Sequence, residues 1–258
     1  MMQPDKIEQA AAILATAKVV VAFTGAGVSQ ESGIPTFRNA QTGLWKKYDP
    51  EDLATPAAFQ RNPKLVWSWY LHRLTIVSAA HANPGHHALV DLAAQIHQTH
   101  VITQNVDDLH ERAGSMDVIH LHGRLGQFRC SQDCTGLRSL VEISADSLTD
   151  DHVPLCPNCG AFVRPNVVWF GEQLEPTDLA RAFELASTCD VMLVIGTSGV
   201  VQPASLLPVR AREHGAKVII VNPMKTDQLA SGDIHLQAAS GDVLPAVVNT
   251  LNNLLGRG

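Results

Sequence analysis

The sequence predicts an α/β protein with a doubly wound parallel sheet, a small cysteine-rich module and a helical insert. Short runs rich in Val and Ile alternate along the chain with amphipathic segments, as they do in parallel sheets covered by helices on both faces. Two stretches interrupt this alternation. Residues 39–85 are rich in Trp, Tyr and Pro, and residues 125–165 hold four of the five cysteines.

Four apolar runs are expected to form buried strands, and each ends in glycine or polar residues. The runs lie near residues 18–23, 99–103, 190–195 and 217–221, and the stretches that follow read TGAG, TQNVD, GTSG and VNP. Helices are expected near the N-terminus and over residues 85–97, 175–187, 204–215 and 241–255. Ligands of such sheets bind at the carboxyl ends of the strands. The four polar stretches therefore predict one shared site.

Composition excludes several classes of protein. The chain has 258 residues, enough for one large α/β domain or two modest ones, and a net charge of −6. It has no Lys/Arg block typical of nucleic-acid binding and no apolar run long enough to span a membrane. The first residues lack the basic start and apolar centre of a signal peptide. We therefore expect a cytoplasmic protein with neither a nucleic-acid nor a membrane partner.

The first polar stretch continues as GAGVSQESGIPTFR. Gly25 and Gly27 can adopt positive φ and allow the backbone to approach a ligand, so that loop amides cradle a pyrophosphate. The alternative is a tight turn after a strand. The third glycine comes late, at Gly33, which disfavours an ordinary dehydrogenase, and the missing Walker lysine disfavours nucleoside triphosphate hydrolysis.

The cysteines form two short pairs, CSQDC and CPNC. Cys130, Cys134, Cys156 and Cys159 suit tetrahedral zinc, and a site of four thiolates is closed, hence structural. The alternative is four reduced cysteines without a metal. The fifth, Cys189, is expected to pack in the core.

Five motifs in this order resemble the sirtuin family of NAD-dependent protein-lysine deacylases: GAGVSQESGIPTFR, TQNVDDLHERAG, HLHG, RPNVVWFGE and GTSGVVQPASLLP. The resemblance covers nearly the whole chain. It implies a Rossmann-like NAD-binding domain made of residues 1–38, 86–124 and 166–258, a helical insert over 39–85 that shapes the acyl pocket, and a zinc-binding module over 125–165. The first cysteine pair departs from the family, which usually has two intervening residues.

The resemblance assigns catalysis to His122, Asn105 and Asp107. His122 is the second histidine of HLHG and matches the general base, a task that suits a pKa near neutrality. His120 and His122 alternate on an expected extended segment and should face one side. The acyl oxygen attacks the ribose carbon that carries nicotinamide, His122 takes a proton from a ribose hydroxyl, and the acyl group passes to ADP-ribose. Glu111 and Arg112 read as a solvated helix face.

Further NAD contacts follow from the resemblance along the glycine loop and at the later strand ends. They are assigned to Gly25, Ala26, Gly27, Ser29, Thr36, Phe37, Arg38, Gln104, Asn105, Asp107, Gly196, Thr197, Ser198, Asn222 and Ser240. Thr36 stands where most relatives have an acidic residue, and Met224 also departs from an acidic position.

The substrate side is assigned to two segments. Val168, Trp169, Phe170 and Gly171 look like the edge strand that pairs with a substrate backbone. Tyr70 and Arg73 lie three apart on an expected helix and can bind a terminal carboxylate, with room left by the small Ala57. This resembles the sirtuins that remove succinyl and malonyl groups. The alternative is a solvated helix face.

Two other functions stay open at this point. One is protein ADP-ribosyl transfer on the same scaffold, which would move label from NAD to protein. The other is a non-catalytic NAD-sensing or zinc-ribbon module, which would release no nicotinamide. The presence of His122, Asn105 and Asp107 together argues against the latter.

Overall fold

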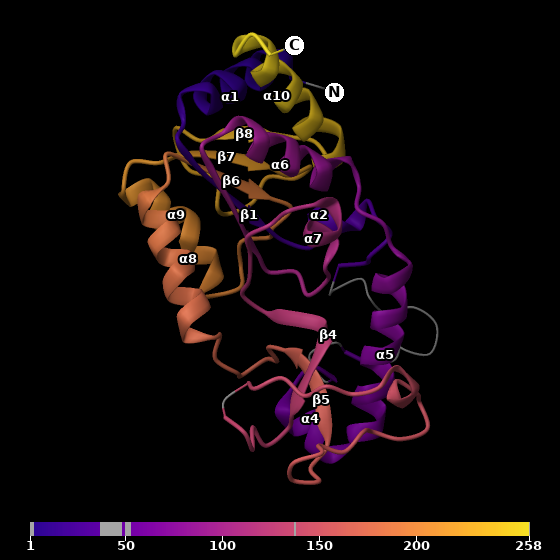
Figure 1. Ribbon diagram of the computed structural model, residues 1–258. Coiled ribbons are helices and arrows are strands. Elements are labelled where there is room, and N and C mark those ends of the chain that lie inside the picture. The colour runs from indigo at the N-terminus through magenta and orange to yellow at the C-terminus, as the bar shows by residue number, and fades with distance from the viewer. Residues whose placement is uncertain (1–2, 37–47, 50–52, 137, 258) are drawn as a thin grey trace. The chain divides into compact units, whose positions relative to one another are not determined.

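A computed structural model describes residues 3–36, 48–49, 53–136 and 138–257. Its centre is a parallel sheet of six strands (Figure 1). The strands are β1 (Val19–Thr24), β2 (Gln98–Thr103), β3 (Val118–His120), β6 (Val191–Ile195), β7 (Lys217–Val221) and β8 (Ile234–Leu236).

The order of the strands is β3-β2-β1-β6-β7-β8. Counted along the chain within this sheet, the order is 3-2-1-4-5-6, which is the doubly wound order of dinucleotide-binding domains. The order reverses between β1 and β6, which pair from Val20 with Val191 to Thr24 with Ile195. Ligands bind at such a reversal, beyond the carboxyl ends of the strands. The predicted fold class is confirmed.

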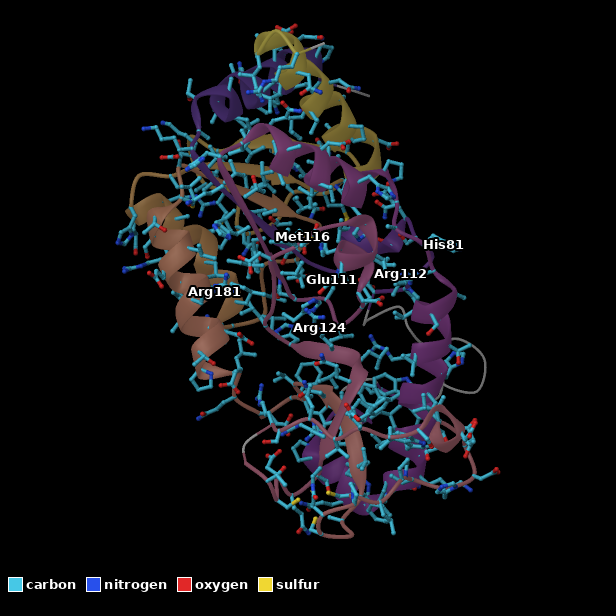
Figure 2. All side chains as sticks on the ribbon, in the orientation of Figure 1. His81, Glu111, Arg112, Met116, Arg124 and Arg181 are labelled. Atoms are coloured by element: carbon cyan, nitrogen blue, oxygen red, sulfur yellow. The ribbon has the colours of Figure 1, made fainter. Side chains whose placement is uncertain are left out.

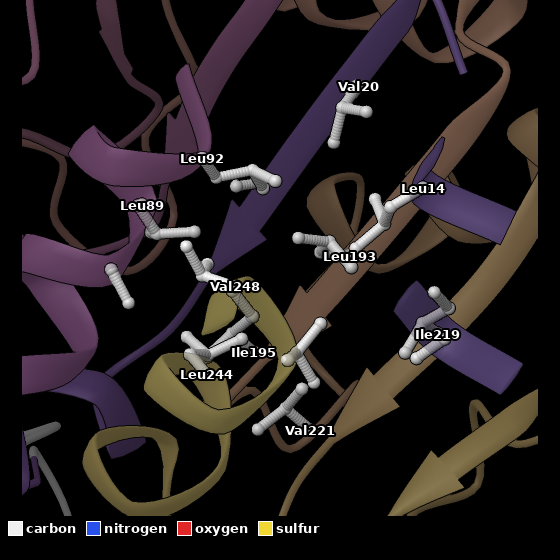
Figure 3. Packing of buried hydrophobic residues seen from close by; sticks show 14 of the residues in the cluster. Leu14, Val20, Leu89, Leu92, Leu193, Ile195, Ile219, Val221, Leu244 and Val248 are labelled. Atoms are coloured by element: carbon white, nitrogen blue, oxygen red, sulfur yellow. The ribbon is translucent and has the colours of Figure 1, made fainter. Parts of the chain in front are cut away.

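Helices cover both faces of the sheet (Figure 1). The helices α1 (Pro4–Thr16), α6 (Pro84–Gln95) and α10 (Ser240–Leu254) lie on one face, and α8 (Pro176–Thr188) and α9 (Leu207–Glu213) on the other. Figure 3 shows the first interface, where Leu14, Leu92 and Val248 pack on Val20 and Leu193. Burial on both faces explains why the central strands β1, β6 and β7 are nearly uninterrupted apolar runs.

The N-terminus of α6 fixes the segment that follows β1. Asn83 caps the helix by accepting a hydrogen bond from the Gly85 N–H at 2.9 Å. The Asn83 side-chain amide donates to the Val28 carbonyl at 2.7 Å and to the Ser32 hydroxyl at 2.9 Å. The short helix α2 (Gly27–Gln30) is thereby anchored beside the sheet.

The chain divides into two compact units. The first contains the described residues of Met1–Ile34, His81–Leu121 and Glu175–Gly258, and the second those of Pro35–Ala80 and His122–Leu174. The second unit contains α4 (Pro56–Arg61), α5 (Pro63–Ala79) and an antiparallel pair, β4 (Gly123–Cys130) with β5 (Val163–Val167). The described part of the predicted insert up to Ala80 falls in this unit, as do the four paired cysteines, and the boundaries of the three predicted segments stay a prediction.

The remaining short elements are α7 (Leu109–Ala113), η3 (Ala145–Ser147) and η4 (Ala204–Leu206). Among the described residues, none of the helices combines the length and the apolar character needed to cross a bilayer.

Candidate functional site

The glycine loop packs directly against the end of β6. The Gly25 N–H donates to the Ile195 carbonyl at 2.9 Å, and the Gly27 N–H donates to the Gly196 carbonyl at 2.8 Å. A Cβ on Gly27 would lie 2.6 Å from the Gly196 Cα, so no side chain fits there. The sequence-based expectation that Gly25 and Gly27 adopt positive φ is wrong, because neither does. Glycine is needed at both positions because the backbone of residues 196–197 approaches too closely for a side chain. Ala26 lies between the two glycines and caps α2.

Three predicted catalytic or cofactor residues meet beside this loop. The Asn105 side-chain amide donates to the Gly25 carbonyl at 3.2 Å and to the Ser29 hydroxyl at 3.0 Å. The Ser29 hydroxyl in turn donates to Asp107 Oδ2 at 3.0 Å. Asn105 and Asp107 are each 6% exposed, and Ser29 is 1% exposed. We call Ser29, Asn105 and Asp107 the amide–carboxylate cluster.

Burial raises the pKa of Asp107, although hydrogen bonds from the Leu109 N–H and the Ser29 hydroxyl oppose the rise. A buried carboxylate has a stronger field than a hydrated one, because water does not screen it. Asp107 is therefore suited to stabilise positive charge that develops on a sugar ring during loss of a leaving group.

A second group of predicted cofactor residues gathers at the ends of β2, β6 and β7. Gln104 Nε2 donates to the Thr197 hydroxyl at 2.9 Å. Asn222 Nδ2 donates to the Thr197 carbonyl at 3.0 Å. Ser198 follows Thr197 and is exposed. These amide and hydroxyl groups suit a ligand rich in hydroxyls, such as a ribose.

The other predicted cofactor residues do not all lie in the first unit, and two of them lie outside the described residues. Ser240 lies at the start of α10, and its hydroxyl donates to Glu31 Oε1 at 2.8 Å. Thr36 is half-buried and belongs to the second unit. Phe37 and Arg38 lie outside the described residues. Sequence reasoning missed Glu31, whose carboxylate also accepts from the Gly241 N–H at 3.0 Å.

The two histidines of HLHG have different surroundings. His120 ends β3 and is 7% exposed; its Nδ1 lies 3.1 Å from the Asn105 carbonyl oxygen and its Nε2 lies 2.7 Å from Glu111 Oε1. Leu121 and His122 form a turn, so the expected continuous extended segment through both histidines is wrong. Glu111, labelled in Figure 2, pairs with His120 and is not simply a solvated residue. His122 is half-buried and begins the second stretch of chain in the second unit.

A buried network of hydrogen bonds connects helix α7 and strands β1 and β2 to the backbone of Asn105 in the amide–carboxylate cluster. His110 Nε2 lies 2.9 Å from the Thr24 hydroxyl, which donates to the Thr103 hydroxyl at 2.8 Å. The Thr103 hydroxyl accepts from the Asn105 N–H at 3.0 Å. Burial lowers the pKa of His110 to about 3. A neutral, buried imidazole of this kind holds the loop after β2 in place.

The four predicted metal ligands converge in the second unit. The sulfur atoms of Cys130, Cys134, Cys156 and Cys159 all lie within 4.8 Å of one another. A zinc ion with Zn–S bonds of about 2.3 Å holds its sulfurs roughly 3.8 Å apart. The residues therefore fit a structural zinc ion. The extra residue of the first pair is accommodated by Asp133, whose φ is +46°. Cys189 is buried in the first unit, as predicted.

The segment expected as an edge strand is not a strand in the structure. β5 ends at Val167, and residues 168–171 follow without strand pairing. The Val168 N–H donates to the His122 carbonyl at 2.9 Å, and the Phe170 N–H donates to the Ala54 carbonyl at 2.9 Å. Trp169 is buried, Phe170 is 43% exposed and Gly171 has a φ of +86°. Because these N–H groups already bond within the chain, no ladder forms here.

Helix α5 presents the predicted acyl-binding pair. Tyr70 is 4% exposed, and its hydroxyl accepts a hydrogen bond from Trp169 Nε1 at 2.8 Å. Burial raises the pKa of Tyr70 to about 12, against the opposing charge of Arg73. The Arg73 guanidinium carbon lies 5.1 Å from the centre of the Trp69 ring. The solvated-face alternative is thus wrong for Tyr70. Ala57 is exposed on α4.

A glycine loop at the reversal of strand order, next to buried amides and a carboxylate, defines a dinucleotide-binding domain, and the second unit adds a four-cysteine module. Residues 25–203 match the model of the Sir2 family. The chain is 50% identical to NAD-dependent protein deacylase 1 of Pseudomonas aeruginosa, over 92% of this chain and 95% of the relative.

Two solved structures extend the comparison. The crystal structure of a Sir2 homolog–NAD complex has a TM-score of 0.88 and 44% identity, covering 96% of this chain and 94% of that one. The structure of Sir2Af2 bound to a myristoylated histone peptide has a TM-score of 0.79 and 35% identity, covering 99% and 100%. The chain belongs to the Sir2 family, and the predicted family is confirmed.

Proposed function

We propose that this Sir2-family enzyme removes acyl groups that end in a carboxylate, such as succinyl and malonyl, from lysine side chains, and acetyl groups as well. The placement of Tyr70 carries the proposal. Its hydroxyl accepts a bond from Trp169 inside an aromatic environment, and no residue in the described part of the chain accepts its own proton, which can therefore serve as a donor. Arg73 lies on the same face of α5, one turn on. A phenol and a guanidinium together suit a carboxylate.

The general activity is that of the family: the chain is an NAD-dependent protein deacylase, which bears out the predicted enzyme class and co-substrate. The alternative of ADP-ribosyl transfer is not favoured, because the relatives are named as deacylases. NAD supplies the ADP-ribose that receives the acyl group, and zinc serves as a structural ion.

The protein groups divide the chemical tasks. His122 acts as the general base that takes a proton from a ribose hydroxyl. Asn105 orients the ligand and Asp107 stabilises positive charge as nicotinamide leaves. Gln104, Thr197 and Asn222 hold the sugars through amide and hydroxyl contacts. These roles rest on the match to the family motifs and on the buried contacts of the first unit.

The partners in this proposal are acylated lysines of proteins or peptides. Segment 168–171 is tied to the His122 carbonyl through Val168, which supports a role in presenting the substrate. A cytoplasmic location is part of the proposal, supported by five free cysteines, four of them gathered as a thiolate site. Cell fractionation that finds the protein with disulfides in an oxidising compartment would contradict it.

The test compares succinyl-lysine and acetyl-lysine peptides of one sequence by mass spectrometry, with and without NAD. We expect both to be cleaved only with NAD, and Arg73→Met to lower kcat/KM for the succinyl peptide about 10- to 100-fold, since a charged hydrogen bond is lost. Arg61→Met, at the exposed end of α4, is the matched control. Equal losses on both peptides for Arg73→Met would refute the acyl preference, and labelled protein would favour ADP-ribosyl transfer.

A further inference from the structure

We infer that Glu172 is a positioning residue that sets acyl selectivity by fixing Trp169 and, through it, the direction of the Tyr70 hydroxyl. The inference rests on the proposed function, because it concerns selectivity for a carboxylate-bearing acyl group. Glu172 closes the motif RPNVVWFGE, in which Trp169 also lies, and the assigned chemistry does not use it.

Glu172 is the centre of a buried ionic cluster in the second unit. Its carboxylate accepts two hydrogen bonds from Arg164, at 2.6 and 3.0 Å, and one from Arg129 at 3.3 Å. Both arginines are 4% exposed. Burial alone would raise the pKa of Glu172, but the hydrogen bonds and charge of Arg164 outweigh it and lower the pKa. The carboxylate therefore stays ionised and balances the buried guanidinium groups.

The same carboxylate holds the backbone of Trp169. Glu172 Oε2 accepts the Trp169 N–H at 2.8 Å, and the Glu172 N–H returns a bond to the Trp169 carbonyl at 3.0 Å. The Arg164 guanidinium carbon lies 3.1 Å from the centre of the Trp169 ring. Glu172 thus fixes the tryptophan twice, directly through its main chain and indirectly by orienting the arginine stacked on its ring.

Trp169 then determines what Tyr70 offers a ligand. An indole N–H can only donate, so the Tyr70 oxygen is used as an acceptor in the bond from Trp169. The phenol proton must point away from the indole and is presented as a donor. A donor suits an anionic acyl terminus, whereas a methyl group gains nothing from it. The arrangement therefore discriminates between succinyl and acetyl groups without direct contact by Glu172.

A purely structural role is the rival explanation, because the cluster also reaches the cysteine module. Arg129 donates to both oxygens of Asp133, at 2.9 and 3.1 Å, and Asp133 lies between Cys130 and Cys134. Loss of Glu172 would leave two buried guanidinium groups without their shared partner and would lower stability. A change in stability would affect both acyl substrates equally, but the proposed role changes their ratio.

The experiment measures the ratio of kcat/KM for succinyl-lysine to that for acetyl-lysine in the full-length, zinc-loaded protein. Glu172→Gln and Trp169→Phe are each expected to lower this ratio about tenfold, the effect of one misdirected hydrogen bond. Trp169→Phe keeps an aromatic ring and leaves the ionic cluster in place, so it tests the link even where Glu172→Gln folds poorly. Glu142→Gln, which neutralises an exposed carboxylate of the second unit, is the control and should leave the ratio unchanged.

A double-mutant cycle completes the test. In a Tyr70→Phe background, Trp169→Phe should change the ratio no further, because its effect passes through the phenol. A high wild-type ratio that neither Glu172→Gln nor Trp169→Phe alters would overturn the inference alone. A wild-type ratio near or below one would overturn the proposed acyl preference, and the inference with it.

Discussion

The backbone carbonyl of His122 accepts the N–H of Val168 at 2.9 Å. This bond continues the antiparallel pairing of β4 with β5, whose first pair is Gly123 with Val167. The residue expected to act as base and the segment expected to present the substrate therefore begin at the same end of one small sheet. The position of the His122 main chain is set by this sheet.

Replacing His122 with Ala should abolish turnover and leave the fold intact. Removing a general base typically lowers the rate 10²- to 10⁴-fold, and we expect the steady-state formation of deacylated lysine to fall by about that factor with an unchanged melting temperature. His120→Ala is the informative comparison, because both nitrogens of His120 have partners within the fold. It should lower the free energy of unfolding by about 1–3 kcal/mol. Normal turnover by His122→Ala would remove the assigned base.

The sheet end also makes a prediction about Gly123. Its φ is +75°, and an added Cβ would lie 2.1 Å from the Asn166 carbonyl oxygen. Gly123→Ala should cost at least about 1–3 kcal/mol of stability from backbone strain alone, read as a fall in melting temperature. Gly126 lies in the same strand with open space around its would-be Cβ. Gly126→Ala should be tolerated, and an equal loss in both variants would contradict the steric argument.

Asp107→Asn should separate stability from activity. Burial raises the pKa of Asp107, so the folded state holds the proton more tightly than the unfolded one. Ionisation therefore costs stability, and this cost grows as the pH rises from about 3.9, the unfolded value, through the folded pKa. The variant should lose activity about 10²-fold or more, while its melting temperature rises relative to wild type as the pH increases from 4 to 7. Asp108→Asn, at a largely exposed neighbour, should show neither effect.

The longer strands of the sheet could be predicted from the sequence, but the shortest strands and the turn within HLHG could not. The strands β1, β6 and β7 are visible as apolar runs and β2 as the pair Val101 and Ile102 before a polar stretch, and their parallel arrangement follows from the intervening helices. β3 and β8 have only three residues each and carry too little periodicity to be seen. The turn at Leu121 broke the expected alternation of the HLHG histidines.

Ion pairs and hydrogen bonds between residues far apart in the chain could not be predicted from the sequence either. Glu31 meets Gly241 across 210 positions, and Glu172 meets Arg129 across 43. Neither contact has a local sequence signal, because it depends on how distant elements pack. The cysteine pairs were visible because metal ligands come in short, characteristic spacings. The first pair departs from the usual spacing, yet its sulfurs still join the cluster.

Acid should destabilise the first unit through a buried histidine. Burial lowers the pKa of His86 to about 4, with a further contribution from the charge of His87. Its ring lies 4.9 Å from that of His110. The pKa of His86 in the folded state is below the unfolded value of about 6.5. Its contribution to the free energy of unfolding is therefore fully present above pH 6.5 and is lost as the pH falls toward 4.

His86→Gln isolates this contribution. Gln suits the third helical position of a capping box, so it can preserve the bond to the Asn83 N–H. The slope of unfolding free energy against pH between 6.5 and 4 should decrease by about 1.4 kcal/mol per pH unit, the linkage of one proton. His97→Gln, at an exposed site, is the control. An unchanged slope in His86→Gln denaturant titrations would mean that folding does not lower the pKa of His86.

Removal of zinc should unfold the cysteine module. Binding to four thiolates supplies roughly 10–16 kcal/mol of apparent free energy in small zinc modules, and the buried hydrophobic residues around the cysteines form only a small cluster. We expect one zinc per chain by elemental analysis, and both chelation and Cys156→Ser should abolish it and lower the melting temperature. Cys189→Ser, at the lone cysteine of the first unit, should retain the metal. Full zinc content in Cys156→Ser, or an unchanged melting curve after chelation, would show that the four sulfurs do not hold a structural ion.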